Sequence, residues 1–112
     1  MKKIEAIIRK SKFYNVKKAL HNIEVNFFSY WDVTGVGNDK EGHVYRGVSY
    51  STSNIQRRYI SIVVSDEFEQ ITIDAILGSA YTGEVGDGKI FVLPAEEAYR
   101  IRTKEKGKTS LN

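Results

Sequence analysis

Residue types that could hold an anion gather in the last third of the chain. Three glycines lie between Thr82 and Lys89, and two arginines, Arg100 and Arg102, follow. Glycine lets backbone N–H groups approach a ligand closely and adopt positive φ, and a lysine adds a point charge. Together these residues suit phosphate binding. A simple glycine turn between a helix and a strand would explain the glycines equally well, and the residue types alone leave both interpretations open.

Hydrophobic spacing predicts the elements that would position this glycine-rich corner. Runs rich in β-branched and aromatic residues predict strands over residues 4–9, 25–34, 59–64 and 89–93. Apolar residues at helical spacing predict a helix over residues 13–22 and a second one after Asp66. The order strand, helix, strand, strand, helix, strand is that of an α+β, ferredoxin-like βαββαβ fold with an antiparallel sheet.

The start of the second predicted helix carries a capping-box pattern. Asp66 is followed three residues later by Glu69, a spacing at which side chains can satisfy free N–H groups of the first turn. The apolar stripe of this helix is expected to consist of Phe68, Ile71, Ala75 and Ile76.

The predicted strand over residues 25–34 has large side chains on both faces. Phe27 and Trp31 alternate with Phe28 and Tyr30. A strand of this kind is usually covered on both sides, whereas the helices of this fold cover one face of the sheet. We expect a partner subunit to cover the other face.

Between Gly35 and Arg57 the hydrophobic pattern stops, and glycines, serines and charged residues replace it. A loop of this length in a small domain is usually functional or disordered. It contains Tyr45, Arg46 and Tyr50, and tyrosine and arginine often anchor protein interfaces. The pattern predicts a partner-binding loop over residues 35–57, with a solvated hairpin tip as the alternative.

Composition narrows the class of protein. The 112 residues make one domain, and we expect the polar tail, residues 104–112, to be mobile. A hydrophobic content of 41% excludes a disordered protein, and the absence of cysteine excludes disulfide and thiolate chemistry. No apolar run could span a bilayer and no signal-peptide pattern opens the chain, so we expect a cytoplasmic protein. The net charge of +3 is spread along the chain, which does not indicate nucleic-acid binding.

Four segments resemble the P-II nitrogen-regulatory signal proteins. TGEVGDGKIFV at residues 82–92 resembles their C-terminal signature, and YRGVSY at 45–50 resembles the motif of their long T-loop. MKKIEAIIR at 1–9 and RIRT at 100–103 also match, so the resemblance runs in order through nearly the whole chain. It implies the ferredoxin-like fold, a T-loop over residues 35–57, a homotrimer, and ATP or ADP bound between neighbouring subunits.

The resemblance also implies how the nucleotide would be held. Glycine N–H groups would face the phosphates, and basic side chains would pair with phosphate oxygens. Arg100 and Arg102 would reach across the subunit interface, pointing the same way if their segment is extended. The implied nucleotide contacts are Ile7, Ser29, Gly35, Val36, Gly37, Val63, Gly86, Asp87, Gly88, Lys89, Arg100 and Arg102.

The family also senses 2-oxoglutarate through a magnesium ion that bridges it to ATP. The resemblance assigns Arg9, Asp39 and Arg57 to this effector, and Asp39 to the magnesium ion. Asn38 and Asp39 stand where the family has an arginine and a glutamine. A carboxylate is a good magnesium ligand, but its charge would repel a dicarboxylate. The alternative is a divergent regulator that binds nucleotide without sensing 2-oxoglutarate.

The T-loop would carry the output of such a protein. Tyr45, Arg46 and Gly47 are the implied contacts with a target, such as an ammonium transporter, glutamine synthetase or a modifying enzyme. A membrane would be reached only through a protein target. Tyr50 occupies the position that is uridylylated in the family. A small nucleotide-hydrolysing enzyme is the remaining alternative, but the sequence offers no catalytic Ser–His–acid set, and we predict that the chain is not an enzyme.

Overall fold

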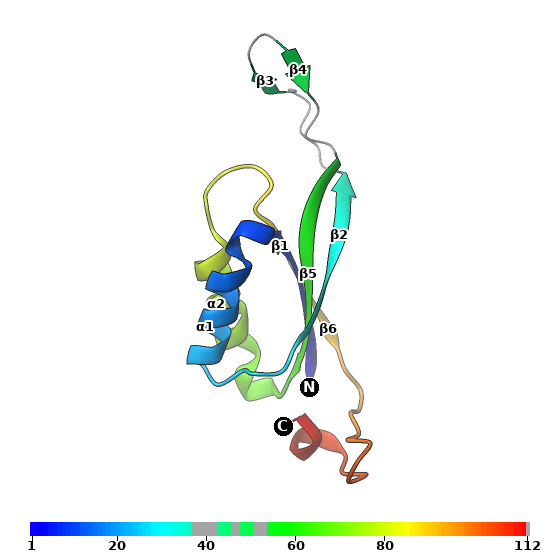
Figure 1. Ribbon diagram of the computed structural model, residues 1–112. Helices are drawn as coiled ribbons and strands as arrows, with labels where there is room; N and C mark the ends of the chain where they lie inside the picture. Colours follow the sequence, from blue (N-terminus) through cyan, green and yellow to red (C-terminus); the bar gives the residue numbers. More distant parts are fainter. Residues whose placement is uncertain (37–42, 46–47, 51–53, 112) are drawn as a thin grey trace.

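The computed structural model describes residues 1–36, 43–45, 48–50 and 54–111. One antiparallel sheet has the strand order β2-β5-β1-β6. Its strands are β1 (Lys2–Arg9), β2 (Ser29–Val36), β5 (Asn54–Val64) and β6 (Gly88–Pro94). Helices α1 (Phe13–Asn22) and α2 (Glu69–Ala80) lie side by side on one face of this sheet (Figure 1). The predicted ferredoxin-like α+β arrangement is therefore confirmed.

The hydrophobic core lies between the sheet and the two helices. Alternate residues of each strand point toward the helices, as the period of two in a strand requires. On β1 from Ile4 to Ile8 and on β5 from Ile60 to Val64 these residues are fully or almost fully buried, and so are the inner residues of the helices. The core includes Ile4, Ala6, Ile8, Val16, Leu20, Ile60, Ile62, Val64 and Ile76.

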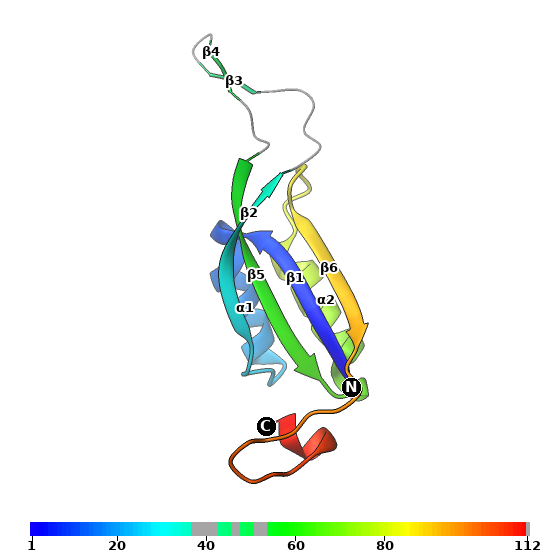
Figure 2. The same ribbon diagram turned by 90° about the vertical axis from the view of Figure 1, so that its right-hand side faces the viewer.

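Neither α-helix covers the opposite face of the sheet in the described part of the chain (Figures 1 and 2). The residues that alternate with the core point to this face, and the register aligns Ile7 with both Lys89 and Tyr59 across the ladders. The Trp31 ring stacks on Tyr59 at a centroid distance of 4.7 Å. Trp31 keeps 45% and Phe91 46% of its surface exposed. We refer to this side as the open face.

Two strand boundaries differ from the sequence prediction. β2 begins at Ser29 rather than residue 25 because the chain is still turning out of α1; the Val25 N–H donates to the Leu20 carbonyl at 2.9 Å. β5 begins at Asn54 rather than residue 59 because its polar residues have partners. Arg58, for example, donates to Asp32 of β2 at 2.9 Å.

The predicted loop over residues 35–57 is therefore partly sheet. Its two ends belong to β2 and β5, and a short hairpin forms between β3 (His43–Tyr45) and β4 (Val48–Tyr50). Each hairpin strand is only three residues long, too short for hydrophobic spacing to predict it.

The predicted capping box is wrong. A 3-10 turn, η2 (Asp66–Phe68), precedes α2, and neither element has a side-chain cap among the described residues. Asp66 instead accepts a hydrogen bond from the N-terminal amine of Met1 at 2.9 Å. That ion pair lowers the pKa of the Asp66 carboxyl.

The predicted stripe of α2 is also partly wrong. Ile71 is 45% exposed, and Phe68 lies outside the helix. Because the 3-10 turn occupies residues 66–68, the α-helix begins only at Glu69, and a different set of residues faces the sheet. The buried residues are Thr72, Ile76 and Ala80.

The C-terminal part of the chain lies at the end of the sheet away from the residues that join α2 to β6 (Figure 2). It contains a 3-10 helix, η3 (Gly107–Leu111), within the segment expected to be a mobile tail. Its mobility stays a prediction. In the described part of the chain, no helix is long and apolar enough to cross a membrane.

Candidate anion-binding site

A cavity of about 390 Å³ opens on the side of the molecule where the sheet meets the loop over residues 82–88, which we call the glycine loop. The ends of β1, β2 and β5 and the start of β6 contribute to it, and Figure 2 shows the glycine loop beside the tip of β2. Its volume is in the range of small-molecule sites. The lining residues are Ile7, Gly35, Val36, Ile55, Arg57, Gly86, Gly88, Lys89 and Phe91.

Two glycines of the loop are required by its geometry. Gly86 has φ +100° and Gly88 has φ +105°, which other residues rarely adopt. A Cβ on Gly88 would lie 1.7 Å from the carbonyl oxygen of Ile7. A Cβ on Gly86 would lie 2.7 Å from Nη2 of Arg57, so the missing side chain lets the guanidinium group pack directly against the glycine loop.

Asp87 organises the glycine loop from within. Its carboxylate accepts hydrogen bonds from the backbone N–H groups of Thr82 at 2.8 Å and Gly83 at 2.9 Å, and from the Thr82 hydroxyl. Arg9 Nε donates to it at 3.0 Å. These bonds, led by those from Thr82, hold the pKa of the Asp87 carboxyl far below its usual range. Asp87 thus acts as a loop-building residue and lies outside the lining of the cavity.

Two arginines lie next to each other beside the glycine loop. Arg9 and Arg57 face each other across the β1–β5 ladder. Arg9 is held by Asp87 and by the Val85 carbonyl, to which its Nη2 donates at 2.9 Å. Burial and the nearby Arg9 charge lower the pKa of Arg57. A second cation next to a partly buried arginine makes an anion favourable at this point.

The cavity brings together seven of the residues singled out from the sequence. Ile7 and Lys89 come from the paired strands β1 and β6, Gly35 and Val36 from β2, Arg57 from β5, and Gly86 and Gly88 from the glycine loop. The seven are Ile7, Gly35, Val36, Arg57, Gly86, Gly88 and Lys89. Residues from four separate parts of the chain therefore form one site.

Two lining residues, Ile55 and Phe91, were missed by the sequence analysis. Both follow from strand alternation. Ile55 stands two residues before Arg57, and Phe91 stands two residues after Lys89, so each shares a face with a residue already singled out.

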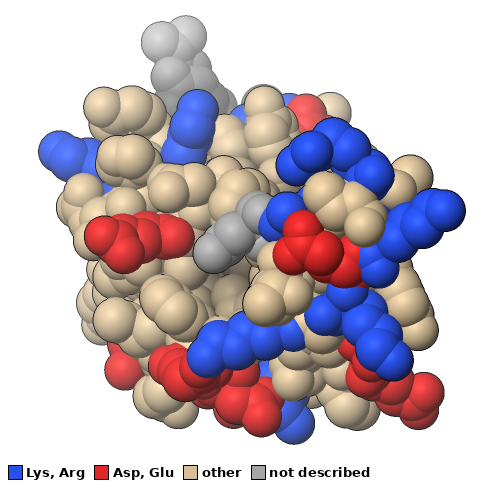
Figure 3. Space-filling model, turned by 90° about the horizontal axis from the view of Figure 1, so that it is seen from below, with Lys and Arg blue, Asp and Glu red and all other residues tan. Residues whose placement is uncertain are grey.

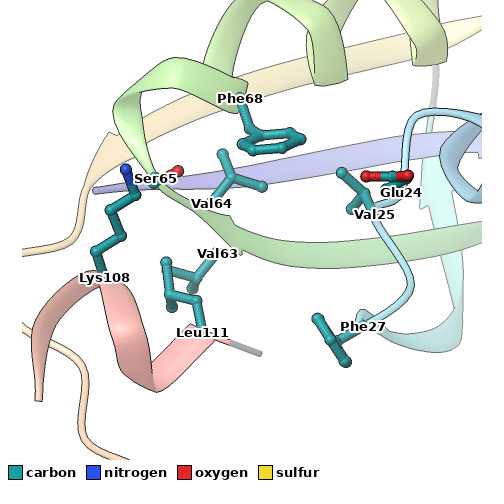
Figure 4. Close-up of a pocket in the computed structure, with 9 residues that line it drawn as sticks. All are labelled: Glu24, Val25, Phe27, Val63, Val64, Ser65, Phe68, Lys108 and Leu111. Carbon is teal, nitrogen blue, oxygen red and sulfur yellow. The ribbon is translucent and has the colours of Figure 1, made fainter. Parts of the chain in front are cut away.

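Four other predicted residues lie elsewhere in the same chain. Ser29 starts β2, and Val63 lies near the end of β5, where it lines a separate cavity of about 160 Å³ (Figure 4). Arg100 and Arg102 lie in the C-terminal segment, at the far end of the sheet from the glycine loop (Figure 1). Residues 101–103 form a turn, closed by a hydrogen bond from the Lys104 N–H to the Arg100 carbonyl, so the extended segment assumed for the arginines is wrong.

Several predicted residues belong to the long loop. Gly37, Asp39, Arg46 and Gly47 lie outside the described residues, whereas Tyr45 ends β3 and Tyr50 ends β4. Asp39 is the residue assigned to magnesium. Within the described ranges, no group of three or more His, Cys, Asp or Glu residues lies close enough together to hold a metal ion.

The fold and the site define a small ferredoxin-like protein with a glycine-lined, basic cavity beside a long loop. Comparison with known proteins agrees with this class. Residues 1–105 match the family described as Nitrogen regulatory protein P-II. The protein of that name from Azospirillum brasilense is 45% identical over 109 residues, covering 96% of each chain. Those from Nostoc punctiforme and Rhodobacter capsulatus are 44% and 43% identical, with at least 95% of each chain covered.

The chain therefore belongs to the P-II nitrogen regulatory protein family. Its role is nitrogen-regulatory signalling, and proteins of this family act by regulating partner proteins in nitrogen metabolism. The family is one of signal-transduction proteins rather than enzymes, which confirms the prediction that the chain is not an enzyme. The resemblance seen in the sequence is confirmed as well.

Proposed function

We propose that the chain is a homotrimeric signalling protein that binds ATP or ADP in the 390 Å³ cavity and reports the bound state to a target through its T-loop. The observation that carries this proposal is the convergence of Gly86, Gly88, Lys89 and Arg57 on one cavity. Backbone N–H groups freed of side chains, a lysine and an arginine fork are the groups that hold phosphates.

The residue types that line the cavity support the binding of a nucleotide. The missing Cβ of Gly86 lets the Arg57 guanidinium lie against the glycine loop, so this cation and the loop would meet the same phosphate group. Lys89 adds a second cation to the lining of the cavity. Ile7, Ile55 and Phe91 supply the apolar surface that a base needs. Asp87 would act indirectly, by keeping the glycine loop in shape.

A neighbouring subunit would complete the site with Ser29, Val63, Arg100 and Arg102. The exposed aromatic residues of the open face support an assembly, since Trp31 and Phe91 each leave almost half of their surface uncovered. The two groups of predicted nucleotide contacts lie at opposite ends of one chain. These two groups can form one site only when the glycine-loop end of one subunit meets the C-terminal end of the next subunit.

Sensing of 2-oxoglutarate is part of the proposal. Arg57 lines the cavity and Arg9 lies opposite it on β1; Asp87 pairs with Arg9, which leaves the Arg57 guanidinium as the cation that would meet a carboxylate of the effector. Asp39 would bind magnesium when ATP is present, and the ion would supply the positive charge that joins the effector to the phosphates. The alternative is a regulator that binds ATP but not 2-oxoglutarate.

The output of the protein would run through the T-loop in the cytoplasm. Tyr45, Arg46 and Gly47 would contact an ammonium transporter, glutamine synthetase or a modifying enzyme. Tyr50 would be the residue for uridylylation. The position of β2 and β5 supports this route, because both strands lead from the cavity directly into the loop.

Isothermal titration calorimetry tests the proposal. ATP is titrated into the full chain, and then 2-oxoglutarate is added with ATP and magnesium present. Lys89→Ala should weaken ATP binding by about 10- to 150-fold, the loss of one charge-assisted contact of roughly 1.5–3 kcal/mol. Lys17→Ala is the matched control, since Lys17 is an exposed lysine of α1. Equal affinity in both variants would remove the proposed site, and ATP binding without 2-oxoglutarate binding would favour the alternative.

A further inference from the structure

The C-terminal segment, residues 98–111, is closed on itself by its own backbone. The Gly107 N–H donates to the Ala98 carbonyl at 2.9 Å, and the Arg100 N–H donates to the Glu105 carbonyl at 2.8 Å. A turn over residues 101–103 joins the two sides, and the Ser110 hydroxyl donates to Ala98 at 3.1 Å. The segment is a compact unit rather than an extended arm.

This closed segment engages the guanidinium group of Arg100. Nη1 of Arg100 lies 3.3 Å from the Glu105 carboxylate, and Nη2 donates to the Thr109 carbonyl at 3.3 Å. The Arg100 side chain is 24% exposed. Both terminal nitrogens of the group thus have partners within its own segment. Binding of a phosphate by the same fork would compete with these contacts.

The same segment is also fastened to the body of the protein. Lys108 forms an ion pair with Glu67 of η2. Leu111 lines the 160 Å³ cavity together with Val63 and Phe27, and Figure 4 shows Leu111 directly beside Val63. Figure 3 views this end of the molecule and shows basic and acidic side chains interleaved over it.

We infer that the C-terminal segment is an internal competitor for nucleotide, which holds Arg100 and covers Val63 until the nucleotide displaces it. The inference rests on the proposed function, because Arg100 and Val63 are two of the residues that a neighbouring subunit would lend to the nucleotide site. Glu105 and the Thr109 carbonyl take the place of phosphate oxygens on Arg100. Leu111 occupies apolar surface at Val63.

The competition predicts how much nucleotide affinity should change and how the nucleotide should affect the C-terminal segment. An ion pair that is this exposed contributes little, so its removal should tighten nucleotide binding by about 1.5- to 5-fold. Coupling between two equilibria is reciprocal, so the nucleotide must in turn open the C-terminal segment. The conformation of the C-terminal segment would then depend on bound nucleotide, as would that of the T-loop.

The test compares two full-length variants with the same change in charge. Glu105→Gln removes the acid that pairs with Arg100, and Glu96→Gln removes an exposed acid nine residues earlier. ATP affinity is measured for both by calorimetry. Hydrogen exchange of residues 104–111 is followed in the unmodified chain with and without saturating ATP.

The inference predicts that Glu105→Gln binds ATP more tightly than Glu96→Gln by the stated factor, and that ATP speeds exchange in residues 104–111. Equal affinity of the two variants would overturn it while leaving the proposed function intact, and so would exchange that ATP slows or leaves unchanged. Failure of the unmodified chain and both variants to bind ATP would remove the proposed function and this inference together.

Discussion

Replacing Gly88 by alanine is expected to destabilise the protein, because the added methyl group has no room. An alanine Cβ at this position would lie 1.7 Å from the carbonyl oxygen of Ile7 and 2.8 Å from its carbonyl carbon. Both atoms belong to β1, whose ladder with β6 begins at Gly88, so relief requires a shift of backbone. The φ of +105° is an additional source of strain.

The size of the effect follows from these contributions. A strained backbone conformation costs a non-glycine residue about 1–3 kcal/mol. Shifting the start of β6 weakens hydrogen bonds of the ladder, at about 1 kcal/mol each. We expect the free energy of unfolding to fall by about 2–4 kcal/mol, which corresponds to a drop in Tm of roughly 8–20 °C for a domain of this size.

Gly78→Ala is the matched control for this substitution. Gly78 lies in α2, and an added Cβ would meet nothing within 4 Å. Alanine should stabilise the protein there by about 0.5–1 kcal/mol, because glycine loses more conformational freedom on folding. Both variants are unfolded in a calorimeter at one protein concentration, since assembly makes Tm depend on concentration. A Tm for Gly88→Ala equal to that of the unmodified chain would refute the steric reasoning.

Three further outcomes are expected. Folding lowers the pKa of the Asp87 carboxyl, so the ionised carboxylate contributes fully to stability above about pH 4, and this contribution is lost as the pH falls below that value. The urea midpoint of Asp87→Asn should therefore drop less between pH 7 and pH 3 than the urea midpoint of the unmodified chain. Asp39→Gln should raise the affinity for 2-oxoglutarate with magnesium and ATP in calorimetry, and an unchanged or lower affinity would make Asp39 a productive magnesium ligand. Deleting residues 40–53 should abolish capture of partners in a pull-down and leave ATP affinity intact; partners retained equally by this deletion, by Arg46→Ala and by the unmodified chain would move the output surface elsewhere.

Most of the fold could be predicted from the period of the hydrophobic residues. Ile4, Ala6 and Ile8 mark β1, and every predicted helix and strand is present. The predicted boundaries of helices and strands were wrong where a polar residue pairs with a partner far away in the sequence. Arg58 extends β5 because Asp32 lies opposite it on β2, and Asp66 is turned away from its helix by the N-terminal amine. Such pairings arise only once the sheet has formed.

The candidate site was predictable to a similar degree. The glycines and Lys89 could be recognised because positive φ and a phosphate-binding charge demand those residue types. The role of Asp87 could not, since its bonds to Thr82 and Gly83 depend on how the loop folds back and its partner Arg9 is 78 residues away in the chain. The turn after Arg100 also escaped prediction, because its stability depends on hydrogen bonds to residues that follow.

The central claim is that one nucleotide site is shared between two subunits, and complementation between variants tests it most directly. Lys89→Ala damages the cavity at the glycine loop, and Arg102→Ala damages the group of contacts at the other end of the chain. Each variant alone should bind ATP weakly in calorimetry. When the two are unfolded together and refolded as an equal mixture, random trimers with head-to-tail contacts should regain full affinity at about a quarter of their sites. A mixture in which no site recovers would contradict a site shared between subunits.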